Sequence, residues 1–353
     1  MPTVTAAAAP IAAVGASLDQ IATPALLVCL PTLERNVARL ASTAAAHPAI
    51  RLRPHAKAFK SGELAQILPY ERYCAQTVRE AEVLVNTGGV TDVLLTNQIV
   101  GANKLARLAA LAKDGATIGA LVDHPSHVAA LDSAATAAGV TLAAYVEVDG
   151  GQNRCGVSAG SDAALALAQA IAASPALTMG GLQCYHGAIQ HVRDPAERRQ
   201  LVLEGPVAAA AATVARLAEA GIACPQVSGG GTGTYTFELE GGVHTELQPG
   251  SFLFMDGDYR NNEDESDTKF EQSLFVHASV ISTNEADGRR VLDAGSKAID
   301  LLCGMPMLAV LPENTLLEAL RGVTFSNGGD EHGILNGVPE GLLPVGSTVQ
   351  LVP

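Results

Sequence analysis

The feature that most constrains the fold is the alternation of short strand-like runs with helical segments between Pro31 and about Tyr259. The helical segments are rich in alanine and leucine, and several stop at a glycine, as before Gly139. Eight strands that alternate with helices predict an α/β fold of the (β/α)8 TIM-barrel type, with an open doubly wound sheet as the alternative. The eight candidate strands are 50–55, 73–77, 92–97, 118–123, 143–149, 180–186, 226–230 and 246–254.

The pattern changes after Tyr259 and predicts a second domain. Residues 261–269 are polar and acidic, and the runs 273–283 and 289–294 are typical of strands with no long helix between them. The run TPALLVCL precedes the first helix and is also strand-like, so we expect it to pair with this second domain. The predicted division is a barrel over 31–259, a mostly β domain from 18–30 with 260–353, and a flexible leader over 1–17.

Composition excludes several classes of protein. Hydrophobic residues make up 48% of the chain and charged residues 16%, which is the balance of a well-buried globular protein. The net charge of -14 excludes a nucleic acid partner, because counterion release requires a basic surface. No run of 18 or more apolar residues is free of charges and turn formers, so we expect no membrane span and no membrane partner.

Two further observations bear on the location of the protein in the cell. The six cysteines are scattered without a Cys-x-x-Cys pair, so neither a zinc site nor a disulfide framework is indicated. The first 17 residues lack the basic segment before an apolar one that marks a secretory signal. Both observations favour a reducing cytoplasm.

The first candidate for catalysis is Lys57, the last residue of the motif RPHAK. This motif closes the first predicted strand, and a barrel carries its active site at the carboxyl ends of its strands. A lysine at that mouth is partly withdrawn from water, which lowers its pKa and frees the amine to form a Schiff base with a carbonyl cofactor. A solvated surface charge is the alternative. Gln76, after the second predicted strand, is a further candidate for the same mouth.

Two glycine loops are candidates for binding phosphate. The loop SGGGTG follows the seventh predicted strand, and the loop QPGS lies within the eighth. Converging backbone N–H groups in such loops bind phosphate without lysine or arginine, and the loops after strands seven and eight are the usual phosphate clamp of a barrel. A plain flexible loop is the alternative. The candidate residues are Gly230, Gly231, Thr232, Gly250 and Ser251.

Aromatic, basic and histidine side chains follow the fifth and sixth predicted strands. Tyr185 is placed to lie against a cofactor ring, and His191 to act as a general base near neutral pH. Arg154 offers a fixed cation to a ring nitrogen. The alternatives are a core tyrosine, a surface histidine and a structural ion pair.

In order along the chain, RPHAK, VDGGQNRCGV, GLQCYHGAIQH, SGGGTG, ELQPGSFLFMDGDY, LDAGSKA and DEHG resemble motifs of the D-threonine aldolase and D-serine dehydratase family. The resemblance runs from about Thr23 to the last residue, and GLQCYHGAIQH brings the chain closer to the aldolase branch. It implies a fold-type III pyridoxal 5'-phosphate enzyme with a barrel of the alanine racemase type. A homodimer is expected by the same analogy.

The resemblance also assigns roles to the candidate residues. Lys57 would hold the cofactor, with Tyr185 in contact with it and Gln76 nearby. Arg154 would face the pyridine nitrogen, and the two glycine loops would bind the phosphate. His191 would be the catalytic base.

The chain departs from the family pattern at two positions. Relatives often have a histidine before the second lysine of the first motif, where this chain has Phe59-Lys60, and Gln-Lys where it has Gln76-Thr77. Substrate contacts are therefore expected to differ.

The metal site of the family is also expected to differ in this sequence. The resemblance implies a divalent ion (Mn, Mg or Zn) that polarises the β-hydroxyl oxygen. Its ligands, a His-x-Asp or His-x-Cys pair, would lie beyond Pro353, so the C-terminal end is expected to be truncated. The nearest local candidates are Asp330, Glu331 and His332, with a structural turn as the alternative.

The activity implied by the resemblance is retro-aldol cleavage of D-β-hydroxy-α-amino acids to glycine and an aldehyde. D-Threonine and D-3-hydroxyaspartate are the candidate substrates. The alternative on the same cofactor is a D-serine or 3-hydroxyaspartate dehydratase, in which Lys57 takes the Cα proton and a keto acid and ammonia form. A non-catalytic pyridoxal phosphate carrier is disfavoured, because a carrier needs no second domain.

Overall fold

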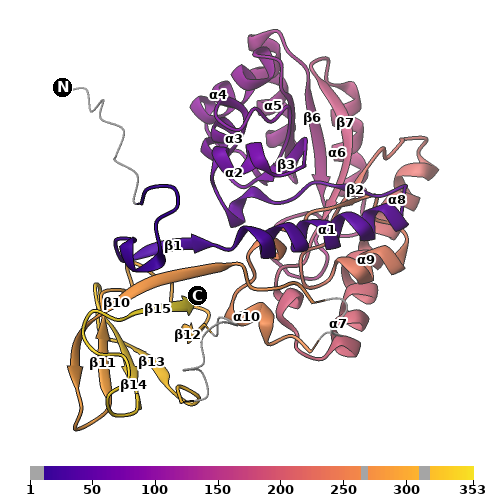
Figure 1. Cartoon of the computed structure of the whole chain (residues 1–353). Helices are drawn as coiled ribbons and strands as arrows, with labels where there is room; N and C mark the ends of the chain where they lie inside the picture. Colours follow the sequence, from indigo (N-terminus) through magenta and orange to yellow (C-terminus); the bar gives the residue numbers. More distant parts are fainter. Residues whose placement is uncertain (1–11, 264–268, 310–318) are drawn as a thin grey trace, which may run out of the picture. The chain divides into compact units, whose positions relative to one another are not determined.

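The computed structural model describes residues 12–263, 269–309 and 319–353, and Figure 1 traces the chain through them. It forms two compact units, a barrel unit of Arg35–Leu253 with Asn262–Phe270 and a β unit of residues up to Glu34, Phe254–Asn261 and Glu271–Pro353. The chain thus passes between the units four times, where the sequence predicted two boundaries, near residues 30 and 260. Residues 1–11 of the predicted leader lie outside the described residues.

The barrel unit is built on eight parallel strands, which confirms the predicted fold class. Their order in the sheet is β2-β9-β8-β7-β6-β5-β4-β3, and a parallel bridge between His55 and Cys74 brings the two ends of the sheet together. The strands are β2 (Arg51–Leu52), β3 (Arg72–Ala75), β4 (Asp92–Gln98), β5 (Thr117–Val122), β6 (Leu142–Glu147), β7 (Leu177–Cys184), β8 (Val227–Gly229) and β9 (Glu246–Leu247).

Helices alternate with these strands, as the apolar periodicity of the sequence indicates. Polar side chains define where several begin: Thr77 caps α3 by accepting a hydrogen bond from Glu80 N, and Ser161 caps α6 in the same way. Gly139 ends α5 with a φ of 71°, a conformation that favours glycine. The helices are α1 (Leu30–Ala46), α2 (Gly62–Ile67), α3 (Val78–Asn86), α4 (Ala102–Lys113), α5 (Pro125–Ala138), α6 (Asp162–Ala173), α7 (Pro195–Val202), α8 (Ala208–Glu219) and α9 (Tyr235–Gly241).

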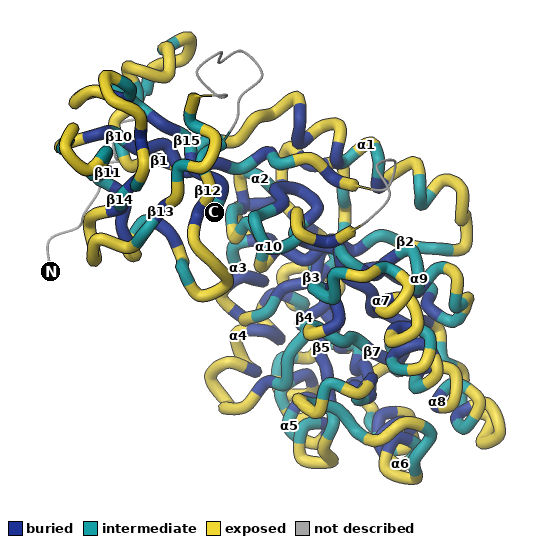
Figure 2. Tube along the Cα trace, turned by 90° about the horizontal axis from the view of Figure 1, so that it is seen from below, coloured by how far each residue is buried: buried dark blue, intermediate teal, exposed yellow. Residues whose placement is uncertain are grey.

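Figure 2 shows the strands buried in the barrel unit and the outer faces of the helices exposed. The eighth strand differs from its prediction, since residues 246–254 form only the two-residue strand β9 followed by a 3-10 turn, η5 (Ser251–Leu253). Pro249 has no N–H to donate to a neighbouring strand, and it is followed by a glycine, so the strand ends there. The residues beyond β9 are therefore a loop at the barrel mouth.

One helical segment bears on the expectation that the chain has no membrane span, although it contains charges and the turn formers Gly205 and Pro206. Helices α7 and α8 are joined by a π-helical turn, η4 (Leu203–Val207), into the segment Pro195–Glu219. Its mean hydropathy is 1.4, and within the described residues it is the one helix long and apolar enough to cross a membrane. It nevertheless packs against α6 and β7 through α8, and the Arg198 side chain is fully buried. These are the contacts of a barrel helix, whose apolar face covers a core.

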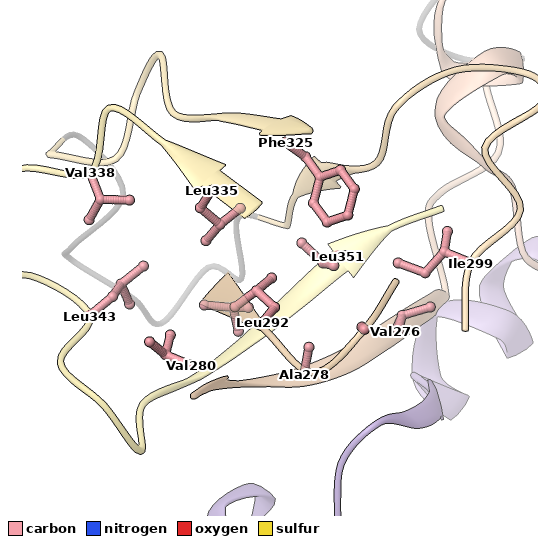
Figure 3. Packing of buried hydrophobic residues seen from close by; sticks show 12 residues of the cluster. Val276, Ala278, Val280, Leu292, Ile299, Phe325, Leu335, Val338, Leu343 and Leu351 are labelled. Atoms are coloured by element: carbon pink, nitrogen blue, oxygen red, sulfur yellow. The ribbon is translucent and has the colours of Figure 1, made fainter. Parts of the chain in front are cut away.

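The β unit is an antiparallel sheet that includes the N-terminal strand, as predicted. Strand β1 (Ala25–Val28) pairs with β10 (Leu274–Asn284), with Ala25 opposite His277. The other strands are β11 (Arg289–Leu292), β12 (Met307–Leu308), β13 (Thr324–Asn327), β14 (Gly333–Asn336) and β15 (Thr348–Val352), and the short helix α10 (Gly257–Arg260) also belongs to this unit. Its core is apolar: Figure 3 shows side chains such as Leu292, Leu335 and Leu351 converging between the strands.

Candidate active site

The Lys57 turn is held in place by a buried histidine. The chain leaves β2 through Arg53 and Pro54 and forms a 3-10 turn, η2 (Ala56–Ala58), that begins after His55. The His55 ring accepts a hydrogen bond from the Lys57 backbone through Nδ1 (3.2 Å), and its Nε2 lies 2.9 Å from Thr96 Oγ1. Burial first and the charge of Lys57 second hold the pKa of His55 well below its usual value. His55 is therefore a neutral cap, with its ring proton on Nε2 facing Thr96.

The Lys57 amine lies at the mouth of the barrel. Its side chain is solvent-accessible, yet enough protein surrounds the amine that desolvation, followed by the charge of Arg154, lowers its pKa. Nζ lies 5.7 Å from the centroid of the Tyr185 ring. Within the described parts of the chain, Nζ makes no hydrogen bond or ion pair, in contrast to Lys60, which pairs with Glu80. Lys57 is thus an amine with a lowered pKa beside an aromatic ring.

Gln76 lies on the same side of the mouth. It follows β3, and its Nε2 donates to the backbone O of Thr96 at 3.5 Å, the residue whose hydroxyl contacts the His55 ring. Its backbone N–H donates to Glu80 Oε2 at 2.7 Å, so that Glu80 connects Gln76 to Lys60. The structure brings Gln76 close to the Lys57 turn.

The loop that carries Arg154 is fixed by its own first residue. The Asp149 carboxylate accepts hydrogen bonds from Gly151 N (2.9 Å) and Asn153 N (3.1 Å), and Asn153 takes a positive φ of 56°. Arg154 itself is exposed and makes no ion pair with a described residue, which contradicts the alternative of a structural ion pair. Its charge acts on both Lys57 and Tyr185. The Arg154 guanidinium, which has no ion-pair partner among the described residues, therefore lies close enough to act on the Lys57 amine through its charge.

Tyr185 follows β7 and is partly buried. Burial is the main cause that raises the pKa of its phenol to about 12, although the charge of Arg154 opposes the shift. The phenol therefore stays protonated at neutral pH and presents a ring face and a hydroxyl donor. His191 ends the 3-10 turn η3 (Ala188–His191), which follows β7 at the same end of the barrel.

The two glycine loops lie next to each other, as predicted. Phe252 N donates to Thr232 Oγ1 at 3.0 Å, which joins the turn η5 to the SGGGTG loop. His55 N donates to Pro249 O at 3.1 Å, which joins the QPGS loop to the Lys57 turn. A Cβ at Gly250 would lie 2.9 Å from His55 O, so this close approach requires glycine. The amine and both loops therefore form one rim.

The loops can receive a phosphate group. Gly230 has a φ of 70°, and a Cβ there would lie 2.9 Å from Leu247 Cδ2. The backbone N–H groups of Thr232 and Ser251 donate no hydrogen bond within the described residues, and both follow glycines that pack closely against neighbouring residues. Free N–H donors in such turns bind anions. The residues present thus fit the phosphate of the cofactor that the sequence implied.

The local metal candidates of the sequence do not form a metal site. Asp330 and Glu331 lie in the exposed turn between β13 and β14, where Lys297 Nζ pairs with Asp330 (3.5 Å) and Glu331 (2.9 Å). These ion pairs favour the alternative of a structural turn for DEHG.

Elsewhere in the described residues, the ligand atoms of Asp123, Glu147 and Cys155 lie within 4.8 Å of one another. Gln98 Nε2 donates to both carboxylates in this group, and Gly156 N donates to Asp123 at 3.0 Å. In this structure the group is therefore a hydrogen-bonded cluster at the ends of β5 and β6.

Sequence reasoning missed several residues that build the site. His55 and Thr96 hold the Lys57 turn, and Gln190 with Thr234 and Glu238 forms a buried network behind the SGGGTG loop. Two signals were present: Gln190 directly precedes the predicted base, and a polar pair spaced four residues apart begins the helix after the loop. Neither signal reveals which backbone groups these side chains reach.

Two family models and several known proteins match the chain. The family model "Alanine racemase, N-terminal domain" matches residues 28–258, and "Putative serine dehydratase domain" matches residues 273–353. The chain is 40% identical over 345 residues to D-threonine aldolase of Arthrobacter sp. and 37% identical over 348 residues to 3-hydroxy-D-aspartate aldolase of Paracoccus denitrificans (strain Pd 1222). Each match covers 96% of this chain and 86% of the relative.

A solved structure matches the fold and most of the chain. The crystal structure of D-threonine aldolase from Filomicrobium marinum superposes with a TM-score of 0.87 at 39% identity. The match covers 95% of this chain and 88% of that chain. The similarity therefore extends through both units.

Proposed function

Since the chain belongs to the alanine racemase-like family that includes D-threonine aldolase, we propose that it is a pyridoxal phosphate-dependent lyase. The proposed reaction is retro-aldol cleavage of a D-β-hydroxy-α-amino acid to glycine and an aldehyde. D-Threonine and D-3-hydroxyaspartate are the first substrates to test, because the relatives named for them cover 96% of the chain. The observation that carries the proposal is the Lys57 amine beside Tyr185, on one rim with two loops suited to phosphate.

The proposed cofactor contacts follow from that rim. Lys57 would carry the cofactor covalently, because burial and the charge of Arg154 lower its pKa and increase the fraction of free amine. Tyr185 would lie against the cofactor ring and Arg154 would supply a cation to the ring nitrogen. Thr232 and Ser251, with the glycines before them, would bind the phosphate through backbone N–H groups. Gln76 would contact the cofactor from the end of β3.

When bound, the cofactor supplies an electron sink for the charge that develops at Cα. The protein must then move one proton from the substrate β-hydroxyl oxygen, and His191 is the proposed base for that step. Tyr185 keeps its phenolic proton at neutral pH and so offers a hydrogen-bond donor. In this proposal, residues that follow β2, β3, β6, β7, β8 and β9 bind and orient the cofactor, and the turn after β7 supplies the base for proton transfer.

The proposal is tested by locating the cofactor and identifying the products. The purified protein is incubated with excess pyridoxal phosphate, reduced with borohydride and digested, and the modified peptide is identified by mass spectrometry. The expected site is Lys57. The same preparation is given D-threonine and D-3-hydroxyaspartate, and glycine plus aldehyde is expected. No glycine from any β-hydroxy-D-amino acid would overturn the proposed activity.

A dehydratase on the same cofactor is the second candidate, because the family model for residues 273–353 is described as a serine dehydratase domain. In that reaction Lys57 would take the Cα proton and the β-hydroxyl would leave. A keto acid and ammonia, instead of glycine and an aldehyde, would identify it. Tight cofactor binding with neither set of products would instead indicate a carrier.

Divalent metal dependence is a separate part of the proposal. Among the described residues, Asp123, Glu147 and Cys155 are the group whose ligand atoms lie close enough together for an ion. Each of the two carboxylates accepts a hydrogen bond from Gln98, and no catalytic step is derived through an ion there. Mn²⁺, Mg²⁺ and Zn²⁺ are added in turn to protein treated with a chelator, and restoration of activity by one of them is expected. Activity that is insensitive to chelation would remove the metal from the proposal.

We also propose a homodimer, by analogy with alanine racemase-like enzymes, and a cytoplasmic location. The six cysteines are free thiols, which a reducing compartment would preserve. Sedimentation velocity at micromolar concentration is expected to give a species of twice the 36.1 kDa chain mass. A monomer throughout the accessible concentration range would contradict the dimer.

A further inference from the structure

A fully buried hydroxyl connects the glycine loop to the turn that carries His191. Thr234 has no exposed surface, and its Oγ1 accepts hydrogen bonds from Gly231 N (3.3 Å) and Gln190 Nε2 (2.8 Å). A hydroxyl has two acceptor sites and one proton, so its own proton must point to the remaining neighbour, Glu238 Oε1, at 2.9 Å. Thr234 therefore uses every hydrogen bond available to it.

Gln190 continues the connection toward the predicted base. Its side chain is 1% exposed, and its amide donates to His186 O at 3.2 Å as well as to Thr234. Its Oε1 accepts from Gly233 N at 3.0 Å. Gln190 belongs to η3, the turn that ends at His191. One amide thus binds the turn after β7 to the loop after β8.

The backbone of the glycine loop is packed tightly against this amide. A Cβ on Gly231 would lie 2.3 Å from Gln190 Oε1, and a Cβ on Gly233 would lie 2.3 Å from Gln190 O. Asn262 Nδ2 in turn donates to Gln190 O at 3.0 Å. Because neither side of the contact has space to shift, a displacement of the loop is transmitted to the turn.

Glu238 is the unusual member of the network. It is 2% exposed, and its Oε2 has no hydrogen-bond partner among the described residues. The atom lies 3.4 Å from the position of a Cβ on Gly230, so it is directed at the backbone of the loop. Burial raises the pKa of this carboxyl to about 7. A buried polar atom without a partner costs stability, so its presence here requires an explanation other than stability.

We propose that Thr234, with Gln190 and Glu238, forms a positioning network that holds the cofactor-phosphate loop and the His191 turn in one register. The inference rests on the proposed function, since it assigns the loop to phosphate and His191 to proton transfer. In this arrangement, phosphate bound at the loop orders the turn, and the network residues act through other residues without touching substrate. Removing the Thr234 hydroxyl weakens cofactor binding and also displaces His191.

The chain contains a matched control for Thr234. Thr213 in α8 is also fully buried, accepts a hydrogen bond from a glycine N–H (Gly160 N, 3.0 Å) and donates to Ala209 O at 2.8 Å. Replacing either threonine by valine keeps the shape and removes one buried hydroxyl. Each substitution thus removes one buried hydroxyl that accepts a hydrogen bond from a glycine N–H, but only Thr234 contacts the loop and the turn.

The experiment compares Thr234→Val, Thr234→Ser and Thr213→Val with the wild-type chain. Pyridoxal phosphate is titrated into each apoprotein and followed by absorbance, and kcat is then measured at saturating cofactor. Thr234→Val is expected to weaken cofactor affinity by about 10- to 100-fold, because two N–H donors lose their acceptor. It should also lower kcat by about 10-fold even when cofactor is saturating. Thr234→Ser should recover most of both losses, and Thr213→Val should bind cofactor within about twofold of wild type.

Each outcome of this experiment decides one question. If Thr234→Val binds cofactor as Thr213→Val does, the positioning network is overturned. If kcat is unchanged at saturating cofactor, the loop and the base are not coupled, and the inference is again wrong. If the Thr234→Val chain does not fold, Gln190→Met tests the proposal instead. It removes the Gln190 amide, leaves Thr234 in place, and should show the same loss of cofactor affinity and of kcat. Failure of the wild-type chain to bind pyridoxal phosphate would instead overturn the proposed function.

Discussion

The interiors of the two units are built in different ways. Inside the barrel, Arg53 Nε donates to Glu246 Oε1 at 2.9 Å and its Nη1 to Asp92 Oδ1 at 2.6 Å, while Gln226 and Ser228 donate to the same glutamate. The core of the β unit consists of twelve buried hydrophobic residues, most of which are shown in Figure 3. Directional bonds fix geometry, whereas apolar packing tolerates adjustment. The chain therefore places its buried directional hydrogen bonds and ion pairs in the unit that holds the candidate site.

Arg53 of the barrel unit and Arg290 of the β unit allow the contrast between the two interiors to be measured. Arg53 is 3% exposed and is paired with Glu246, which has no exposed surface. Burial alone would lower the pKa of Arg53, but the charges of Glu246 and Asp92 hold it above its ordinary value. Arg290 of the β unit has no exposed surface either, but it donates mainly to backbone carbonyls of Leu342 and Leu343, and Glu285, its charged partner, is half exposed.

The largest predicted effect tests whether chemistry is confined to the barrel unit. Lys57→Ala should abolish covalent attachment of pyridoxal phosphate and lower kcat by about 1,000-fold or more, because the chain loses its only proposed nucleophile. Lys297→Ala is the control from the β unit, since that lysine pairs only with exposed carboxylates. Its activity should stay within about twofold of wild type. Substantial turnover by Lys57→Ala would show that the amine is not essential.

The second prediction compares Arg53 and Arg290 by the effect of their removal on folding. Arg53→Met leaves Glu246 as a buried charge without its cation, so the free energy of unfolding should fall by roughly 3–5 kcal/mol. Arg290→Met leaves unpaired carbonyls and a half-exposed carboxylate, for which about 1–3 kcal/mol is expected. Urea unfolding followed by circular dichroism measures both variants. Equal losses in the free energy of unfolding would mean that removing a buried arginine costs no more in the barrel interior than in the β unit.

The third and smallest effect concerns Glu238, the one carboxyl whose pKa burial raises to about 7. From about pH 4.5 to 7, the unfolded chain has released this proton and the folded chain retains it. The free energy of unfolding therefore decreases as pH rises through that window. A glutamine cannot ionise, so Glu238→Gln should become more stable relative to wild type by up to about 3 kcal/mol between pH 4.5 and 7.5.

Urea unfolding of both proteins at half-unit pH steps measures this difference. The subtraction removes titration of the other groups, including His244, whose pKa burial lowers to about 4. A difference that does not change with pH would show that Glu238 is ionised in the folded chain. Glu238 would then act in the positioning network as a charged carboxylate.

The fold class and the family were predicted correctly from the amino-acid sequence, and the same sequence supplied the candidate site residues. Apolar periodicity and glycine stops specify helices and strands locally, and eight alternating pairs leave few topologies. The motifs around Lys57, Arg154, Tyr185 and the two glycine loops likewise stand in continuous segments of sequence, so their chemistry is readable without contacts.

Only the tertiary structure decided how those segments meet. His55 as the cap of the Lys57 turn, and Thr234 as the link between Gln190 and Glu238, depend on side chains that reach residues from 4 to 44 positions away. The structure also ended the eighth strand early and assigned DEHG to a turn paired with Lys297. Hydrogen bonds act over about 3 Å in a stated direction, and no pattern of residue types fixes distances that only packing sets.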